Sequence, residues 1–204
     1  MRNTRKHRQR HTPEEISSRL ERGPVRSYVR DFIYGAIDGT VTTFSVVAGA
    51  SGAALSADIV IILGVANLLA DGFSMAVSNF LGTRAEEQLL AKTRRQEYAH
   101  IRIFPEGERE EIRQIFARKG FSGDDLEHVV TVITSDMECW VDTMLAEEHG
   151  LSLNGPQAWK AALATFVAFF IVGSIPLWTF LWNWLSDVPI ADPFLWSAVA
   201  TAAA

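Results

Sequence analysis

Acidic side chains, one imidazole and one thioether recur at helical spacing in the polar middle of the sequence. They form three pairs: Glu97 with His100, Glu108 with Glu111, and Met144 with Glu148. Because residues three or four apart share one face of a helix, each pair would present two metal donors together. Oxygen donors mixed with nitrogen and sulfur suit a divalent transition ion, since Ca²⁺ and Mg²⁺ prefer oxygen alone. The alternative is a solvated acidic face with Met144 in the core, and spacing alone does not decide between them.

A second group of polar side chains interrupts an apolar stretch that runs from Asp31 to Ala54 and includes Asp38. At about 1.5 Å per residue this stretch can cross a hydrocarbon core of roughly 30 Å as one helix. A carboxylate inside such a helix costs about 2.5 to 3.5 kcal/mol on insertion scales, so it usually faces protein, water or an ion. Helical spacing gives Asp38 three polar neighbours on one side, which are Tyr34, Thr42 and Ser45. Gly35 and Gly39 beside this stripe predict the close approach of another helix. The alternative for Asp38 is that it reaches the nearby interface.

The next apolar stretch, from Ile59 to Leu81, carries a similar polar face. Asn67, Asp71 and Met75 recur at four-residue intervals, so they share one side of the predicted helix. If the two polar faces meet, Asp38, Asp71 and Met75 would line a narrow ion path, with Asn67 as a neutral oxygen donor. Hydrogen bonding between helices, worth about 0.6 kcal/mol per contact in membranes, would explain Asn67 but explains two aspartates poorly.

The elements that must position the first donor set lie between Gly82 and Gly150, where the sequence is polar but keeps helical signals. The second span is expected to continue as one long helix to Pro105, which stops it and begins the next helix. Ser122 is expected to open a third helix, and Ser135, with Glu138 three residues later, a fourth that ends at Gly150. Their apolar faces predict a small acidic bundle, closed by Ile112, Ile115, Phe116, Leu126, Val129, Val130, Ile133, Trp140, Val141 and Leu145.

A third span is expected from Ala158 to about Trp184, kinked at Pro176 and ending in a belt of tryptophans. The last residues, PFLWSAVATAAA, begin a fourth span but are too few to cross, so we expect a chain cut short at its C-terminal end. The predicted fold class is therefore all-α: a polytopic membrane helix bundle with an inserted helical metal-binding domain. The expected parts are a basic tail (1–30), two spans (31–83), the metal-binding domain (84–153), and a third span with the start of a fourth (158–204).

Charge is distributed unevenly along the 204 residues, although the net charge is only -5. Every Lys and Arg lies before position 161, and the N-terminal tail, with an amphipathic piece from Pro13 to Arg22, is strongly basic. The positive-inside rule therefore predicts that the tail and the acidic bundle are both cytoplasmic, and we do not expect nucleic-acid binding. No cleavable signal peptide is visible. The single cysteine, Cys139, excludes an internal disulfide.

Four segments carry a resemblance to a known family: RDFIYGAIDGTVTTFSVVAGASGA, ADGFSMAVSNFLGTRAEEQ, PEGEREEIRQIFARKGF and TMLAEEHGL. From about Tyr28 onward the sequence resembles the vacuolar iron transporter family, and we expect a prokaryotic-type member. The resemblance implies five spans, a homodimer, and export of Fe²⁺, often Mn²⁺ too, from the cytoplasm against protons. It implies that Asp38 and Met75 handle the ion in the membrane and that Asp31 lies at the cytoplasmic mouth. It also implies that the six paired residues named above bind metal in the cytoplasm.

Two positions depart from the family's pattern. Position 100 is His where the family more typically has Glu, which softens the site and lowers its negative charge. Position 67 is Asn where a carboxylate that helps to couple protons is expected. Asp71, one turn further along the same face, is the candidate replacement, so proton coupling depends on that residue.

The leading hypothesis is a non-enzymatic transporter in the prokaryotic cytoplasmic membrane, with a vacuolar membrane as the alternative. Its cargo would be Fe²⁺, with Mn²⁺, Zn²⁺ or Co²⁺ as alternatives, and no organic cofactor is expected. The path residues would be Asp38, Met75, Asp71, Asn67, Asp31 and Thr42. A rival hypothesis is a membrane-anchored, ferritin-like protein that oxidises or stores iron. Glu97-x-x-His100 has the spacing of di-iron bundles, and Asp125-x-x-His128 would be an imperfect second pair. A third is an interaction scaffold without ion chemistry.

Overall fold

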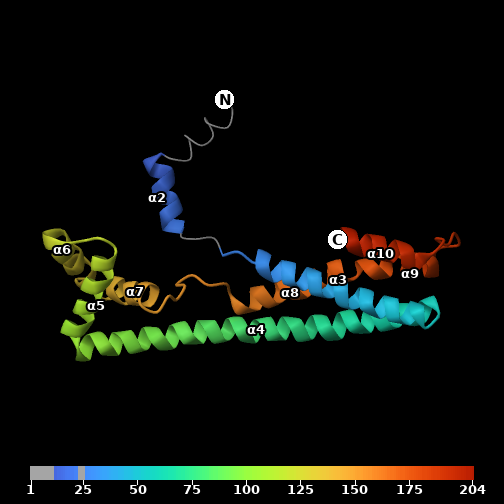
Figure 1. The fold of residues 1–204 in the computed structure, drawn as a ribbon, viewed down its shortest axis with the longest axis horizontal. Coiled ribbons are helices and arrows are strands. Elements are labelled where there is room, and N and C mark those ends of the chain that lie inside the picture. The colour runs from blue at the N-terminus through green and yellow to red at the C-terminus, as the bar shows by residue number, and fades with distance from the viewer. Residues whose placement is uncertain (1–11, 23–25) are drawn as a thin grey trace.

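The computed structural model describes residues 12–22 and 26–204, and all regular structure within these ranges is helical. Residues 1–11 and 23–25 lie outside the described residues, and with them nearly half of the predicted basic tail. The predicted amphipathic piece is the helix α2 (Pro13–Arg22). The larger elements fall into two groups at opposite ends of one long helix, α4 (Ala57–Ile103), as Figure 1 shows.

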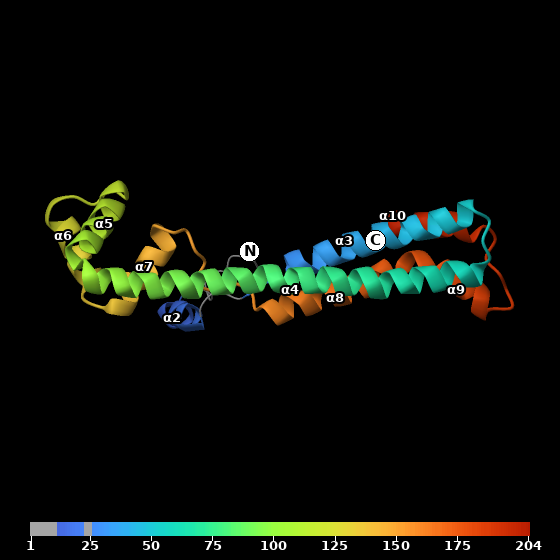
Figure 2. The same ribbon diagram turned by 90° about the horizontal axis from the view of Figure 1, so that it is seen from below.

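Helix α4 has 47 residues and confirms the prediction of a span that continues unbroken into a polar segment. Figure 1 shows it below both groups of helices, and Figure 2, seen from below, shows it along its whole length. It ends before Pro105, whose ring cannot continue a helix because it lacks an amide hydrogen and clashes with the preceding turn. The same proline begins α5 (Pro105–Arg118), where its missing donor costs nothing.

Within the described residues, three helices are long and apolar enough to cross a membrane: α3 (Val29–Gly52), α4, and the run from Ala158 to Leu185. That last run has the predicted break at Pro176: α8 (Ala158–Gly173), a short 3₁₀ turn η1 (Ile175–Leu177) and α9 (Trp178–Leu185). Helix α10 (Pro193–Ala203) then folds back, and the Ser197 hydroxyl donates to the Pro176 carbonyl at 2.7 Å.

The close approach predicted at Gly35 and Gly39 is confirmed, and the helix that approaches is α8. A Cβ added at Gly35 would lie 2.3 Å from the Thr165 carbonyl oxygen, and one at Gly39 would lie 2.6 Å from that of Phe169. Only glycine therefore permits this crossing. Small residues bring the backbones of α3 and α8 together, as is common between membrane helices.

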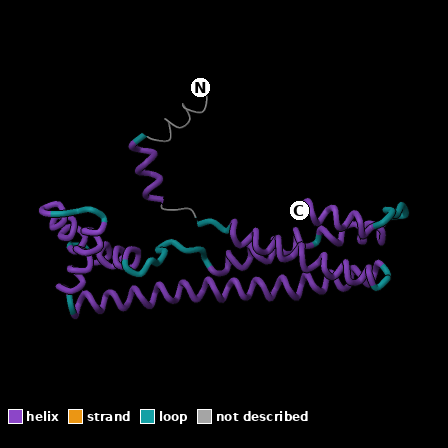
Figure 3. The backbone as a smooth tube through the Cα atoms, viewed as in Figure 1, coloured by secondary structure: helices purple, strands orange, loops and turns teal. Residues whose placement is uncertain are grey.

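At the other end of α4 lies the distal bundle, which we define as α5, α6 (Gly123–Thr134), α7 (Met137–Glu147) and residues 84–103 of α4. Its core confirms most of the predicted apolar face and consists of Ile101, Ile112, Val130, Ile133, Trp140, Val141, Met144 and Leu145. From α7 a loop over residues 148–157, drawn in teal in Figure 3, returns along α4 to the spans.

The predicted start of one helix is wrong by one residue. Helix α6 follows Ser122 as expected, but α7 is capped by Asp136 rather than opened by Ser135. The Asp136 carboxylate accepts the Cys139 amide hydrogen at 2.8 Å, whereas Ser135 closes α6 and its hydroxyl donates to the Val132 carbonyl at 2.7 Å. Two adjacent residues were each able to cap, and the carboxylate is the stronger acceptor for the helix N-terminus.

Candidate metal centre

The first group of metal donors forms where α4 meets α5. Glu97 and His100 are one turn apart near the end of α4, and Glu108 follows in the first turn of α5 because Pro105 turns the chain sharply. His100 Nδ1 lies 3.8 Å from Glu97 Oε1 and 3.7 Å from Glu108 Oε1. Donor atoms of these three residues all lie within 4.8 Å of one another, which is close enough to surround one ion.

A second group shares Glu97 and adds the loop that follows α7. Glu97, Glu148 and His149 also place donor atoms within 4.8 Å of one another. His149 Nε2 lies 3.0 Å from Glu97 Oε1 and 3.6 Å from Glu148 Oε2. Sequence reasoning missed His149, because it lies beyond the end of α7 and helical spacing assigns it no face. The only available signal was an imidazole directly after Glu148.

The electrostatics of the cluster show a shortage of positive charge. Glu97 is 2% exposed and Glu108 is 7% exposed, and the Oε2 atom of each has no hydrogen-bond partner among the described residues. Burial, reinforced by the charges of Glu111 and Glu97, raises the pKa of Glu108 to about 7. Burial and then the charge of Glu111 also raise the pKa of Glu148. Buried carboxylates without partners are costly, so the cluster favours a cation.

The remaining two predicted donors lie apart from these groups. Glu111 is exposed one turn after Glu108, and its charge acts on the pKa of both Glu108 and Glu148. Met144 is fully buried in the core of the distal bundle, where its carbonyl accepts the amide hydrogens of Glu148 and His149. The structure therefore brings together Glu97, His100, Glu108 and Glu148, and adds His149. Glu111 and Met144 as ligands stay predictions.

The expected second pair of a ferritin-like site is not part of this cluster. Asp125 and His128 belong to α6, and neither belongs to a group of donors close enough together to hold a metal ion within the described residues. The helices α5, α6 and α7 have only 14, 12 and 11 residues. The geometry thus gives the di-iron alternative one Glu-x-x-His pair and no matching partner.

The two aspartates predicted for the membrane path do not meet within one chain. Asp38 on α3 and Asp71 on α4 are both exposed, and neither carboxylate has a hydrogen-bond or ion-pair partner in the part of the chain that the structure describes. Thr42, half-buried, donates its hydroxyl to the Asp38 carbonyl at 2.7 Å. The buried face of α3 instead carries Gly35, Gly39 and other mostly small residues.

Helices α3 and α4 contact each other through other side chains. The Asn67 amide donates to the Thr43 hydroxyl at 3.4 Å, and Met75, half-buried, packs against the apolar core of the spans. The expected facing of the two polar stripes is therefore absent from the single chain as described. Asp38 and Asp71 lie on the outer surface of the helix bundle, where a second molecule can reach them.

Asp31, predicted at the mouth of the path, is enclosed where three spans meet. It is 4% exposed, and its carboxylate accepts a hydrogen bond from Asn79 Nδ2 at 3.0 Å. The same Asn79 amide donates to the Thr165 hydroxyl at 2.7 Å, and Thr165 donates in turn to the Asp31 carbonyl at 3.3 Å. These bonds join α3, α4 and α8.

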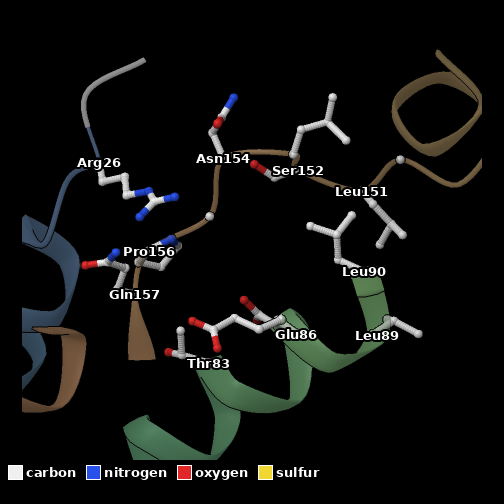
Figure 4. Close-up of a pocket in the computed structure, with 14 residues that line it drawn as sticks. Arg26, Thr83, Glu86, Leu89, Leu90, Leu151, Ser152, Asn154, Pro156 and Gln157 are labelled. Carbon is white, nitrogen blue, oxygen red and sulfur yellow. The ribbon is translucent and has the colours of Figure 1, made fainter. Parts of the chain in front are cut away.

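A cavity of about 510 Å³ lies between the spans and the distal bundle. Figure 4 shows Thr83 and Glu86 of α4 on one side, with Ser152 and Asn154 of the returning loop and Arg26 opposite. One wall of the cavity begins at Gly150, next to His149, and another reaches Thr83, which hydrogen-bonds to Asn79. The cavity therefore lies between the candidate metal centre and the spans.

The sequence model of the VIT family matches residues 29–204. The chain is 34% identical over 162 residues to the vacuolar iron transporter of Toxoplasma gondii, covering 78% of this chain and 53% of that protein. It is 33% identical over 150 residues to vacuolar iron transporter 1 of Arabidopsis thaliana, covering 73% and 60% respectively. The chain thus spans between about half and three fifths of the length of these relatives.

Proposed function

Because the chain belongs to the VIT family, whose model matches residues 29–204, we propose that it is part of a membrane transporter that moves Fe²⁺ out of the cytoplasm. Mn²⁺, Zn²⁺ and Co²⁺ are the alternative cargoes. The relatives carry names of iron transporters rather than of enzymes. The observation that carries the proposal is a donor cluster with buried, unpartnered carboxylate oxygens on a helix that continues into an apolar span.

In this proposal the distal bundle is a cytoplasmic domain that collects the ion. Four carboxylates, Glu97, Glu108, Glu111 and Glu148, attract it, and His100 supplies a nitrogen donor. Because the cluster binds best when its carboxylates are ionised, the ion replaces the proton that Glu108 holds near pH 7. The cavity beside Glu86 then offers a polar route toward the spans.

In the membrane, the proposal gives Asp38 and Met75 the role of ion ligands and Asp71 that of the group that couples protons. Both aspartates are exposed on the single chain. A carboxylate in lipid is expensive, whereas one that faces protein or water is not. We therefore propose that a second copy covers this face, so that the path lies in a homodimer. On the same face of α4, Asn67 carries no carboxylate and its amide bonds to the Thr43 hydroxyl. Asp71 is therefore the carboxylate on that face that could carry a proton.

The test is Fe²⁺ uptake into liposomes that contain the purified protein, under an imposed pH gradient. Asp38→Asn should reduce the initial flux strongly, because the ion loses its charged ligand in the path. Asp71→Asn should reduce the accompanying proton flux, reported by a dye inside the vesicles. The matched control is Asp58→Asn, an exposed aspartate in the first turn of α4. Equal flux for wild type, Asp38→Asn and Asp58→Asn would refute the assigned path.

A further inference from the structure

We propose that His149 is a ligand of the ion held at Glu97, and that an imidazole on each side of this carboxylate makes the centre prefer nitrogen-binding ions over Mn²⁺ and Mg²⁺. This rests on the proposed function, because it takes the same cluster as the ion-collecting site. It goes further by adding a ligand from outside the predicted set and by naming the class of ion that the site selects.

The first argument is geometric. Glu97 lies between the two imidazoles: its Oε1 is 3.0 Å from His149 Nε2 and 3.8 Å from His100 Nδ1. Each imidazole also lies beside a further carboxylate, which is Glu148 for His149 and Glu108 for His100. An ion bound to Glu97 on either side therefore meets one nitrogen and two carboxylates, and neither side consists of oxygen alone.

The second argument comes from the buried carboxylate oxygens. Glu97 Oε2 and Glu108 Oε2 are both enclosed, and neither has a partner in the described part of the chain. An imidazole N–H can satisfy only the Oε1 side of Glu97, so a hydrogen bond from His149 leaves the second oxygen unpaired. A divalent ion can pair with the carboxylate oxygen that a single N–H group leaves without a partner. The His149 side chain is one-third exposed, so an ion can reach it from solvent.

The backbone holds His149 in this position. Its amide hydrogen bonds to the Met144 carbonyl at 3.2 Å, and Leu151 reaches back to the Leu145 carbonyl at 2.9 Å. Gly150 between them has φ +63°, which a residue with a side chain rarely adopts. The chain thus reverses immediately after the imidazole and keeps it against α4.

The expected selectivity follows from the chemistry of the donors. Imidazole suits Fe²⁺, Co²⁺ and Zn²⁺, whereas sites of carboxylate, carbonyl and water suit Mg²⁺ and Mn²⁺. One imidazole on each side of Glu97 therefore raises the affinity for Fe²⁺, Co²⁺ and Zn²⁺ more than the affinity for Mg²⁺ and Mn²⁺. Removing one imidazole should bring these affinities closer together, and replacing it by a carboxylate should bring them closer still.

The experiment is titration calorimetry of the full chain in detergent at pH 7.5, with Co²⁺ and Mn²⁺ as separate probes. His149→Ala should weaken Co²⁺ binding about tenfold or more, because even the loss of a residue that only supports a metal ligand typically costs about 10- to 100-fold in affinity. Mn²⁺ binding should change much less. His149→Asp should lower the ratio of Co²⁺ to Mn²⁺ affinity further. His128→Ala, an exposed histidine on α6, is the matched control and should bind both ions like wild type.

Two results would overturn the proposal. If His149→Ala binds Co²⁺ within about twofold of wild type, His149 is not a ligand; if Co²⁺ and Mn²⁺ weaken equally, it does not set selectivity. Glu97→Gln separates this failure from that of the proposed function. If Glu97→Gln loses binding of both ions while His149→Ala does not, only the present inference fails. If Glu97→Gln binds as wild type does, the cluster is not the ion-collecting site and both proposals fail.

Discussion

The Asn79 side-chain amide donates to the Asp31 carboxylate at 3.0 Å across 48 positions of sequence, and to the Thr165 hydroxyl at 2.7 Å. One amide thus connects three spanning helices at the place where Asp31 is almost fully enclosed. Deleting a buried hydrogen-bond donor leaves its acceptor unpaired, which typically costs about 1 to 3 kcal/mol and more for a charged acceptor. Substituting Asn79 therefore measures how much these hydrogen bonds stabilise the packing of the three spans.

Asn79→Leu should destabilise the protein by about 1 to 3 kcal/mol, because the enclosed Asp31 carboxylate would lose its hydrogen-bond donor. The free energy of unfolding in mixed detergent and dodecyl sulfate micelles measures this. Ser78→Ala, the exposed neighbouring residue, is the control. The double variant Asp31→Leu/Asn79→Leu should recover part of the loss, since both polar partners are gone. A single variant as stable as wild type would show that the bond is not structural.

Gly39→Ala should also destabilise, because its new Cβ would lie 2.6 Å from the Phe169 carbonyl oxygen and push α8 away. Overpacking of this kind costs about 1 to 3 kcal/mol. Gly49→Ala is the same substitution in the same helix with no atom within 4 Å, so it should be neutral or slightly stabilising. The two variants can be compared in the same micelle assay. Equal stabilities would contradict the close packing of α3 on α8.

Because the pKa of Glu108 is raised, we expect the metal-free protein to lose stability as pH rises. Its pKa is about 7 in the folded chain and near 4.5 in the unfolded chain. Between these values the folded state keeps a proton that the unfolded state has lost, so this residue's stabilising contribution falls as pH rises from about 4.5 to about 7. Glu148, whose pKa is also raised, acts in the same direction.

Melting curves of the metal-free protein at several pH values measure this effect, with Glu108→Gln as the reference that cannot ionise. The stability of wild type relative to Glu108→Gln should decline over that interval. Co²⁺ should reverse the trend, and its affinity should weaken as pH falls below about 7, because a proton then competes for the carboxylate. A difference between the two proteins that does not change with pH would contradict the assigned pKa.

We expect Arg94 to affect the affinity for metal although it is not one of the proposed ligands. Its guanidinium pairs with Asp142 and with Glu138 of α7, and so fastens α7 to α4. Because Glu148 and His149 follow α7, Arg94→Met should loosen the second donor group and weaken Co²⁺ binding severalfold. Arg95→Met, which removes the exposed neighbouring charge, is the control. Calorimetry that shows equal affinity for both variants would remove Arg94 from this role.

Much of the fold could be predicted from the sequence because its signals are strong and local. Apolar length defined the spans, and Pro105 defined where α4 ends and α5 begins. Ser135 and Asp136 show the limit of such signals: both can cap a helix, and only the competition for the Cys139 amide hydrogen decides between them.

The site was predicted as far as helical spacing reaches. Glu97 and His100 share a face of α4, Glu108 lies in the first turn of α5 and Glu148 lies at the end of α7, and the structure brings their donor atoms into two groups that share Glu97. His149 lies in a loop that reverses at Gly150, so no periodicity points to it. The position of Asp38 could not be predicted either. Spacing gives the face of a helix, but the choice of buried face depends on how closely Gly35 and Gly39 admit α8.

The length of α4 has a mechanical consequence. A helix of 47 residues without a proline is a stiff rod about 70 Å long, and roughly 33 Å of it extends from Leu81 to Ile103. Rocking its apolar half by about 5° would sweep the far tip by about 3 Å, more than the length of a metal–ligand bond. Glu97 and His100 lie near that tip, while Glu148 and His149 lie directly after α7. A tilt of α4 relative to α7 would therefore change the distances between these two pairs of donors.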